Sequence, residues 1–143
     1  NFTVIKLLQM KTPDPDRYNS SVPIEGAIQF TVATSSDIVS SCLEPEATAY
    51  NISSETINGI KFARYDYYKV GLGNRLSEQV FSTILNNICY RVEIIISGYG
   101  FDIGPELTRE KAEEDRVQYE LPFSVYDVID KLTPILSTFR FLE

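Results

Sequence analysis

The sequence predicts an α+β domain in which helices cover a central antiparallel β-sheet. Residues 57–96 read as strands joined by two short reversals, at residues 71–75 and at residues 86–87. Strands connected by such short turns must run antiparallel. Segments with helix signals lie on either side of this block, at residues 36–43 and 124–136. Because each helix must bury an apolar face, we expect both helices to pack on the sheet.

Each expected strand carries residues that favour β-structure. The expected strands are residues 1–10, 26–33, 60–70, 76–85, 89–96 and 139–141. The strand at 60–70 is rich in aromatic and β-branched side chains, and the strand at 26–33 alternates apolar and polar residues. Gly71 can adopt the positive φ of a tight reversal, and Asn86-Asn87 tolerates left-handed backbone. Residues 97–100 contain two glycines and are expected to break the sheet.

The helices are expected from capping residues and from apolar spacing. The first begins at Ser36, whose side chain can cap it, and ends before Pro45. In the second, Ser124 and Asp127 resemble a capping box. Apolar residues then recur at helical spacing: Val125, Val128, Ile129, Leu132 and Leu136. This stripe predicts a helix with one face on the sheet, and Pro134 within it is expected to kink or locally unpair the helix.

Length and charge limit the classes of partner. With 143 residues, the chain fits one domain, residues 1–143, that can bury its own core. A net charge of -7 disfavours nucleic acids and anionic membrane surfaces, because binding phosphate needs clustered Lys and Arg. Residues 106–120 are dense in charge and predict a solvated helix or loop. No apolar stretch is long enough to span a membrane. The chain begins at Asn1 without a basic leader, so we expect any signal peptide to have been removed or never to have existed.

The absence of histidine limits the chemistry further. It excludes Ser-His-Asp and Cys-His nucleophiles and most catalytic zinc sites. The chain has two cysteines, too few for a structural zinc site or an ordinary iron–sulfur cluster. We therefore expect no cofactor, no metal ion and no catalytic residue, and the sequence favours a binding module over an enzyme.

Two groups of residues are candidates for binding. Asn74 and Arg75 follow the glycines of the first reversal and could form a recognition edge, although turn formation alone explains this segment. Tyr65, Tyr67 and Tyr68 could stack on a sugar or on a partner protein. Strands also carry such residues simply for packing, and packing is the favoured interpretation.

Acidic residues supply weaker candidates. Asp66, Glu78 and Glu93 could lie on neighbouring strands, and a carboxylate pair about 5–9 Å apart is what glycoside hydrolysis requires. Asp14 and Asp16 could contribute to a calcium site, but the glycine and the spaced ligands of an EF-hand loop are absent.

The two cysteines allow two interpretations. Cys42 is expected near the end of the first helix, and Cys89 begins a strand. If the helix packs near that end of the strand, a disulfide could form and close a loop of about 48 residues, worth roughly 4 kcal/mol. Alternatively, both are buried free thiols in a reducing compartment. The spacing alone does not decide between them.

The chain resembles a group of uncharacterised bacterial envelope proteins, some of them lipoproteins, that are similar in pattern to PsbP-like domains. The similarity is carried by the segments Phe30–Leu43, Gly59–Phe62, Gly71–Arg75, Asn86–Tyr90 and Ile135–Phe141. It implies an α/β/α sandwich with a central antiparallel sheet, an exported location and a disulfide between Cys42 and Cys89. The acidic segment at residues 106–120 departs from the pattern of that group. No catalytic residue carries over from it.

The expected function is that of a non-enzymatic module outside the cytoplasm, in the cell envelope or secreted, which binds a protein partner or assists assembly. A lipid or membrane anchor in the precursor would fit this expectation. The alternative is a small ligand-binding protein, or a hydrolase that uses carboxylates and tyrosines. A deep pocket lined by two facing carboxylates would favour the alternative, whereas a shallow and continuous surface would favour the module.

Overall fold

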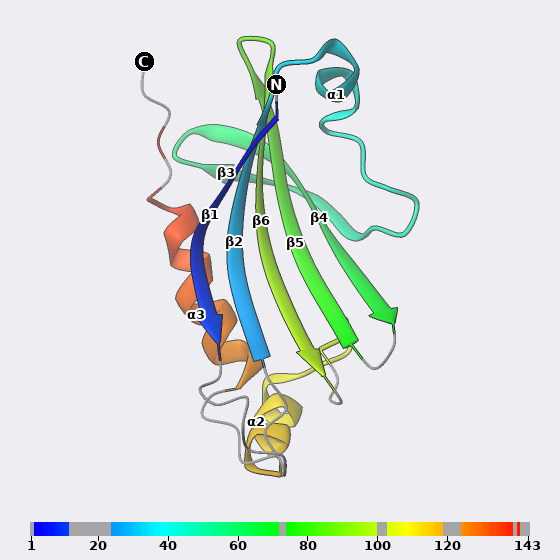
Figure 1. Ribbon diagram of the computed structural model, residues 1–143, viewed down its shortest axis with the longest axis vertical. Coiled ribbons are helices and arrows are strands. Elements are labelled where there is room, and N and C mark those ends of the chain that lie inside the picture. Colours follow the sequence, from blue (N-terminus) through cyan, green and yellow to red (C-terminus); the bar gives the residue numbers. More distant parts are fainter. Residues whose placement is uncertain are drawn as a thin grey trace.

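The fold is built on one curved, six-stranded antiparallel sheet (Figure 1). The structure is a computed structural model that describes residues 2–11, 24–71, 74–99, 103–118, 124–138 and 140. Its strands are β1 (Phe2–Lys11), β2 (Ile24–Ala33), β3 (Tyr50–Ile57), β4 (Ile60–Gly71), β5 (Asn74–Leu85) and β6 (Ile88–Tyr99). Its helices are α1 (Ser36–Ser41), α2 (Arg109–Gln118) and α3 (Val125–Leu136). The strand order β1-β2-β6-β5-β4-β3 places the long strands β6 and β5 in the middle.

Short asparagine turns set the register of the meander. The β3–β4 connection is Asn58-Gly59, with φ angles of 50° and 82°, and the β5–β6 connection is Asn86-Asn87, with φ angles of 50° and 63°. Positive φ at both central residues gives a turn whose twist matches the twist of the flanking strands. β2 then pairs with β6 over ten residues, from Ile24↔Gly98 to Ala33↔Cys89, and so joins the N-terminal strands to the meander.

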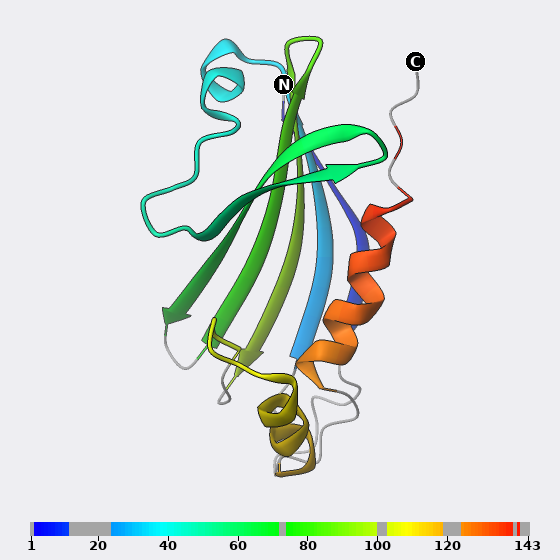
Figure 2. The ribbon, with the colours of Figure 1, turned by 180° about the vertical axis from the view of Figure 1, so that it is seen from behind.

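One face of the sheet carries the main core and is covered by α3. Alternate residues of β2, β5 and β6 point to this face, which we call the concave face, and pack against the apolar stripe of the helix. The buried members of this cluster are Ile28, Phe62, Phe81, Val92, Ile94, Ile96, Ile103, Val125, Val128, Leu132 and Leu136. Figure 2 shows α3 lying along this face, over β2.

The opposite face, which we call the convex face, is covered unequally. The six-residue helix α1 packs on one end of this face, where β2 ends at Ala33 and β6 begins near Cys89, and Val39 and Cys42 are buried there. A second small cluster lies further along, where Tyr65, Tyr67 and Val80 are buried and Ala49 packs on them: this cluster belongs to β4, β5 and the segment before β3. Helices therefore lie on both faces, but the long one lies only on the concave face.

These observations confirm the predicted α+β fold with a central antiparallel sheet and packed helices. The capping box at α3 is also present: Asp127 N donates to Ser124 Oγ at 3.2 Å, and Ser124 N donates to Asp127 Oδ2 at 2.7 Å. Helix α3 continues through Pro134 and ends two residues later, at Leu136. A proline this close to the end of a helix removes only one late hydrogen bond.

Three details of the sequence prediction are wrong. Strand β3 was not expected, although it forms an edge of the sheet. The break expected at residues 97–100 does not occur over residues 97–99, because β6 continues through Gly98 to Tyr99, paired with β5, and residue 100 lies outside the described residues. The N-cap position of the first helix is Ser35 rather than Ser36, and no side-chain hydrogen bond caps the helix there. The strand expected at residues 139–141 lies outside the described residues.

Candidate functional site

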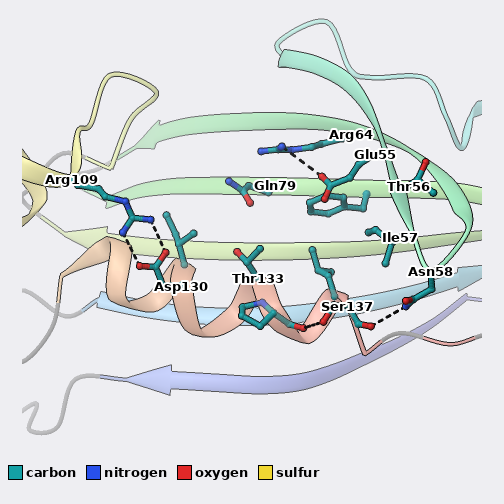
Figure 3. A pocket seen from close by; sticks show the side chains of 14 residues that line it. Glu55, Thr56, Ile57, Asn58, Arg64, Gln79, Arg109, Asp130, Thr133 and Ser137 are labelled. Atoms are coloured by element: carbon teal, nitrogen blue, oxygen red, sulfur yellow. Dashed lines mark hydrogen bonds and ion pairs between the residues drawn. The ribbon is translucent and has the colours of Figure 1, made fainter.

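A groove of about 650 Å³ opens on the concave face, between α3 and the β3–β4 hairpin (Figure 3). The hairpin bends away from the plane of the sheet, so its tip reaches over this face toward the C-terminal end of α3 (Figure 2). The groove is lined by Glu55, Thr56, Ile57, Asn58, Arg64, Gln79, Phe81, Arg109, Ile129, Asp130, Thr133, Pro134, Leu136 and Ser137. Its floor is the sheet, and its walls come from elements far apart in the sequence.

A hydrogen bond closes one end of the groove. Asn58 Nδ2 donates to the backbone carbonyl of Ser137 at 3.0 Å, so the tip of the hairpin is tied to the end of α3. The last carbonyls of a helix lack intrahelical donors, and the asparagine amide supplies one. Asn58 therefore sets both the turn and the contact that frames the groove.

An ion pair closes the other end. Arg109, the first residue of α2, donates to both carboxylate oxygens of Asp130 on α3 at 2.7 Å. The same guanidinium lies 4.5 Å from the ring centre of Tyr126, whose hydroxyl donates to the carbonyl of Leu107 at 2.7 Å. The hydrogen bonds from Arg109 lower the pKa of Asp130, so this carboxylate is ionised. The arrangement fixes where α2 begins relative to α3.

A smaller cavity of about 220 Å³ adjoins the groove and shares Arg64, Gln79 and Ile129 with it. Asp66 lines this cavity and is 6% exposed. Asn51 Nδ2 donates to Asp66 Oδ2 at 3.0 Å. Burial raises the pKa of Tyr50 in the same lining, and the nearby carboxylate of Asp66 raises it further.

Arg64 lies where the two cavities meet. Its Nη1 atom is 3.7 Å from Glu55 Oε2, and its Nε atom is 3.9 Å from Asp66 Oδ1, both longer than hydrogen bonds. The guanidinium also lies 5.7 Å from the ring centre of Phe81. These contacts hold Arg64 in place over the floor of the groove.

The three tyrosines expected to form one cluster lie on two faces. Tyr65 and Tyr67 point to the convex face, 0% and 4% exposed, with ring centres 5.5 Å apart. Tyr68 points to the concave face, where it is half-buried and its hydroxyl accepts from Arg75 Nη1 at 3.3 Å. Successive side chains of a strand point in opposite directions, which accounts for the separation. This placement favours the packing role for Tyr65 and Tyr67.

The recognition edge proposed at the first reversal is only partly described. Asn74 begins β5 and pairs with Gly71 and Tyr99. Arg75 is half-buried and contacts Tyr68 rather than projecting freely into solvent. A binding role for these two residues stays a prediction.

The three acidic candidates do not form one group, because only Glu78 and Glu93 lie near each other. Asp66 lies on the concave face, whereas Glu78 and Glu93 lie on the convex face. On the convex face, Gln29 Nε2 donates to Glu93 Oε2 at 2.9 Å, and Arg91 Nη2 donates to the hydroxyl of Tyr65 at 3.1 Å. Burial raises the pKa of Glu93 and of Glu78, and the charge of Glu78 raises that of Glu93 further.

Metal sites and membrane-spanning helices were also considered from the sequence. Asp14 and Asp16 lie outside the described part of the chain. Within that part, no group of acidic or cysteine side chains has the arrangement of a metal site. None of the described helices is both long and apolar enough to cross a membrane.

The structure contains the disulfide that the resemblance implies. Cys42, the C-cap of α1, is bonded to Cys89 of β6, with the two Cα atoms 5.8 Å apart. The bond is buried beside Ala33 and Val39, and it joins the short helix to β6 at one end of the convex face.

Most groove residues were not singled out from the sequence. Asp66, which lines the smaller cavity, was a candidate, but Arg64 and Glu55, which line the groove, were not. The available signal was the pair Arg64 and Asp66, two opposite charges two residues apart in a strand rich in aromatic residues, and therefore on one face of it. The partners from α2 and α3 carry no local signal, because only the tertiary fold brings them to the groove.

Comparison with known proteins adds a distant likeness. No family model matches the chain, and no curated protein matches it. Among solved structures, it resembles the crystal structure of LpqN, described as involved in cell envelope biogenesis of Mycobacterium tuberculosis. The TM-score is 0.42 at 8% identity, and the match covers 91% of this chain and 79% of LpqN. A likeness this distant carries no functional argument, and the PsbP-like assignment stays a prediction.

Proposed function

We propose that the chain is a non-enzymatic module outside the cytoplasm, which binds a segment of a protein partner in the concave groove. The observation that carries this proposal is the groove itself, which has a volume of about 650 Å³ and is framed by a hairpin, a helix and the sheet. Its lining combines apolar side chains such as Ile57 and Ile129 with polar ones such as Gln79 and Thr133. Binding sites usually combine an apolar lining with a few polar groups that fix orientation.

The state of the carboxylates supports binding rather than hydrolysis. Each carboxylate in the two cavities lies beside an arginine: Glu55 and Asp66 beside Arg64, and Asp130 beside Arg109. A general acid near neutral pH needs a raised pKa, but Arg109 lowers the pKa of Asp130. Asp130 is therefore not suited to act as a general acid.

The disulfide supports the location. A bond such as Cys42–Cys89 forms and persists in oxidising compartments, and is rare where cellular thiols stay reduced. Both cysteines are buried where α1 packs on the sheet.

Site-specific photocrosslinking in the native source tests the proposal. Benzoylphenylalanine is placed at Thr133, which lines the groove, and separately at Lys131, an exposed residue of the same helix that does not line it. We expect a discrete protein adduct from position 133 and none from position 131. Because both positions are exposed on α3, they should fold equally well.

A groove-filling variant shows whether the adduct depends on the groove. Gln79→Trp places a large side chain on the floor and should abolish the adduct from position 133. No adduct from position 133, or equal adducts from both positions, would contradict the proposal. So would an adduct that persists in Gln79→Trp.

A further inference from the structure

The groove reaches the free edge of strand β3. Its lining includes Glu55, Thr56 and Ile57, three successive residues of this strand. Successive side chains of a strand point to opposite faces, so a cavity that contacts all three must also lie along an edge of the strand. The β4 residues that pair with them, 60–62, do not line the groove, and β3 pairs with no other described strand. The edge at the groove is therefore the unpaired one.

Thr56 directs its main-chain N–H and C=O groups toward this free edge. It pairs with Lys61 of β4, whose carbonyl accepts from Thr83 Oγ1 of β5 at 2.9 Å and so points away from β3. In an antiparallel ladder, pairs that exchange hydrogen bonds alternate with pairs whose groups point outward. Thr56 is therefore in an outward pair, and so is Ser54, two residues earlier, which pairs with Ala63. Both residues offer a donor and an acceptor to an added strand.

The regular part of this edge is short. Residues 53–57 pair without interruption with β4, over roughly 16 Å at about 3.3 Å per residue. Before them, the register shifts between Tyr50 and Ser53. Asn51, within this irregular stretch, has a φ of 51°, and its side chain donates to Asp66. An added strand can therefore follow β3 only from residue 53 to residue 57.

The groove also selects the side chains of an added strand. Alternate side chains of such a strand would face the groove, and the others would face solvent. The groove presents apolar surface from Phe81 on the floor and from Ile129 and Leu136 on α3. In recognition by strand addition, the main chain supplies hydrogen bonds, and the surface beside the edge selects alternate side chains. A segment that alternates apolar and polar residues fits both requirements.

A second copy of this chain fits poorly as the source of that strand. The β3–β4 hairpin crosses over the concave face, and residues of α3 line the opposite side of the groove (Figure 2). The free edge of β3 therefore faces α3 across the groove. A strand that carried its own sheet with it would overlap the helix, whereas a single extended segment would not.

We propose that the partner's segment binds as an extended strand added to the free edge of β3. Its main chain bonds to Ser54 and Thr56, and its alternate apolar side chains lie in the groove. This inference rests on the proposed function and names how the groove recognises its partner. Because the bonds are made to main-chain groups, the pattern of apolar residues in the segment matters more than their identity.

Two substitutions at Thr56 test the main-chain bonds in the crosslinking experiment. Thr56→Pro removes the outward N–H and places a ring at the edge, without removing a hydrogen bond to β4. It should abolish the adduct from position 133. Thr56→Ala removes the side chain and keeps the N–H, so the adduct should form as before. Ser54→Pro, at the other outward residue, should act like Thr56→Pro, and slow amide exchange at Ile57 shows that the hairpin has folded in each variant.

Hydrogen exchange in the wild-type protein gives a readout that needs no substitution. The probe is the peptide acetyl-Thr-Val-Thr-Val-Thr-amide, and octyl glucoside below its micellar concentration supplies an apolar chain without a peptide backbone. With saturating peptide, amide exchange at Ser54 and Thr56 should slow by about tenfold or more, because both donors become bonded. Exchange at Glu55 and Ile57, whose groups already bond to β4, should change less. Octyl glucoside should leave exchange at Ser54 and Thr56 unchanged.

The outcomes separate this inference from the proposed function. An adduct that persists in Thr56→Pro, or one that is lost equally from Thr56→Ala, would overturn strand addition. So would peptide that fails to slow exchange at Ser54 and Thr56, and slowing by octyl glucoside would overturn it in favour of an apolar chain. If the adduct from position 133 forms and persists in Thr56→Pro, partner binding stands and only strand addition is wrong. If no adduct forms from position 133 even with Thr56 in place, the proposed function fails, and this inference fails with it.

Discussion

Asn58 holds the hairpin in two ways, through its backbone and through its side chain. Its backbone, with φ of 50°, forms the turn, and its amide donates to the carbonyl of Ser137. Asparagine is among the few residues besides glycine that adopt this backbone readily. A glycine here would keep the turn but lose the contact with the end of α3.

Asn58→Gly should loosen the hairpin without unfolding the protein. We expect the free energy of unfolding to fall by about 1 kcal/mol, because an exposed hydrogen bond is lost and glycine is more flexible. Amide hydrogen exchange at Thr56 and Ile57 should quicken. Asn87→Gly, at a turn with φ of 63°, is the matched control and should leave exchange in the β3–β4 hairpin unchanged. Equal exchange in all three proteins would mean that the contact with Ser137 does not hold the hairpin.

On the convex face, Glu78→Gln should lower the pKa of Glu93. Burial is the main cause of its raised pKa and will remain, but the charge of Glu78, the next cause, is removed. The carboxyl ¹³C shift of Glu93 followed against pH measures this change. Glu106→Gln, at an exposed residue of the segment before α2, should leave the pKa of Glu93 where it was. No difference between Glu78→Gln and wild type would contradict the proximity of the two carboxylates.

The same pair predicts how stability depends on pH. Since the pKa values of Glu78 and Glu93 are raised in the folded protein, folding favours their protonated forms. Their contribution is fully present below the unfolded pKa of about 4.3 and is lost as the pH rises through the folded values. Across that window, the free energy of unfolding should therefore decline less steeply in Glu78→Gln than in wild type.

At the scale of the elements, Gly26 sets how closely α3 approaches the sheet. A Cβ atom at this position of β2 would overlap Cγ1 of Val128 and lie 3.2 Å from Cδ1 of Leu132. Both helix residues are 0% exposed, so neither can move aside freely. The floor under the helix, and with it the width of the groove, depends on the absence of a side chain here.

Gly26→Ala should therefore destabilise the fold by about 1–3 kcal/mol, through overpacking between β2 and α3. Gly71→Ala is the matched control, because nothing lies within 4 Å of a Cβ atom there, and it should change stability by no more than about 0.5 kcal/mol. Urea unfolding of both variants gives the comparison. A similar small effect in both would mean that α3 does not lie against β2 as described.

The elements differ in how well the sequence predicts them. Helix α3 could be predicted because its capping box and apolar stripe are local patterns. Strand β3 could not be found by alternation, since six of its eight residues are exposed and no face is apolar. The signal that could have located it is Asn58-Gly59, a strong hairpin turn. Helix α1 was expected, but its N-cap position is Ser35 rather than Ser36, and no side-chain hydrogen bond caps it.

At the scale of the molecule, the groove could not be predicted because its walls meet only in the fold. Glu55 of β3, Gln79 of β5 and Asp130 of α3 lie far apart in the sequence, and no local pattern specifies their meeting. The disulfide depended on a resemblance for the same reason: spacing left the pairing open, and the packing of α1 on β6 decides it. The α+β class itself follows from short turns and amphipathic helices, which are local.

The central claim is that this chain is a disulfide-linked module outside the cytoplasm, and the redox state of Cys42 and Cys89 tests it most directly. In the chain-entropy model, a bond across 47 positions contributes about 4 kcal/mol to stability. The measurement is alkylation of the protein from its native source, unfolded without reductant, followed by mass spectrometry. The account predicts no alkylated thiol and one peptide pair linking Cys42 to Cys89. Two alkylated cysteines would contradict both the bond and the location.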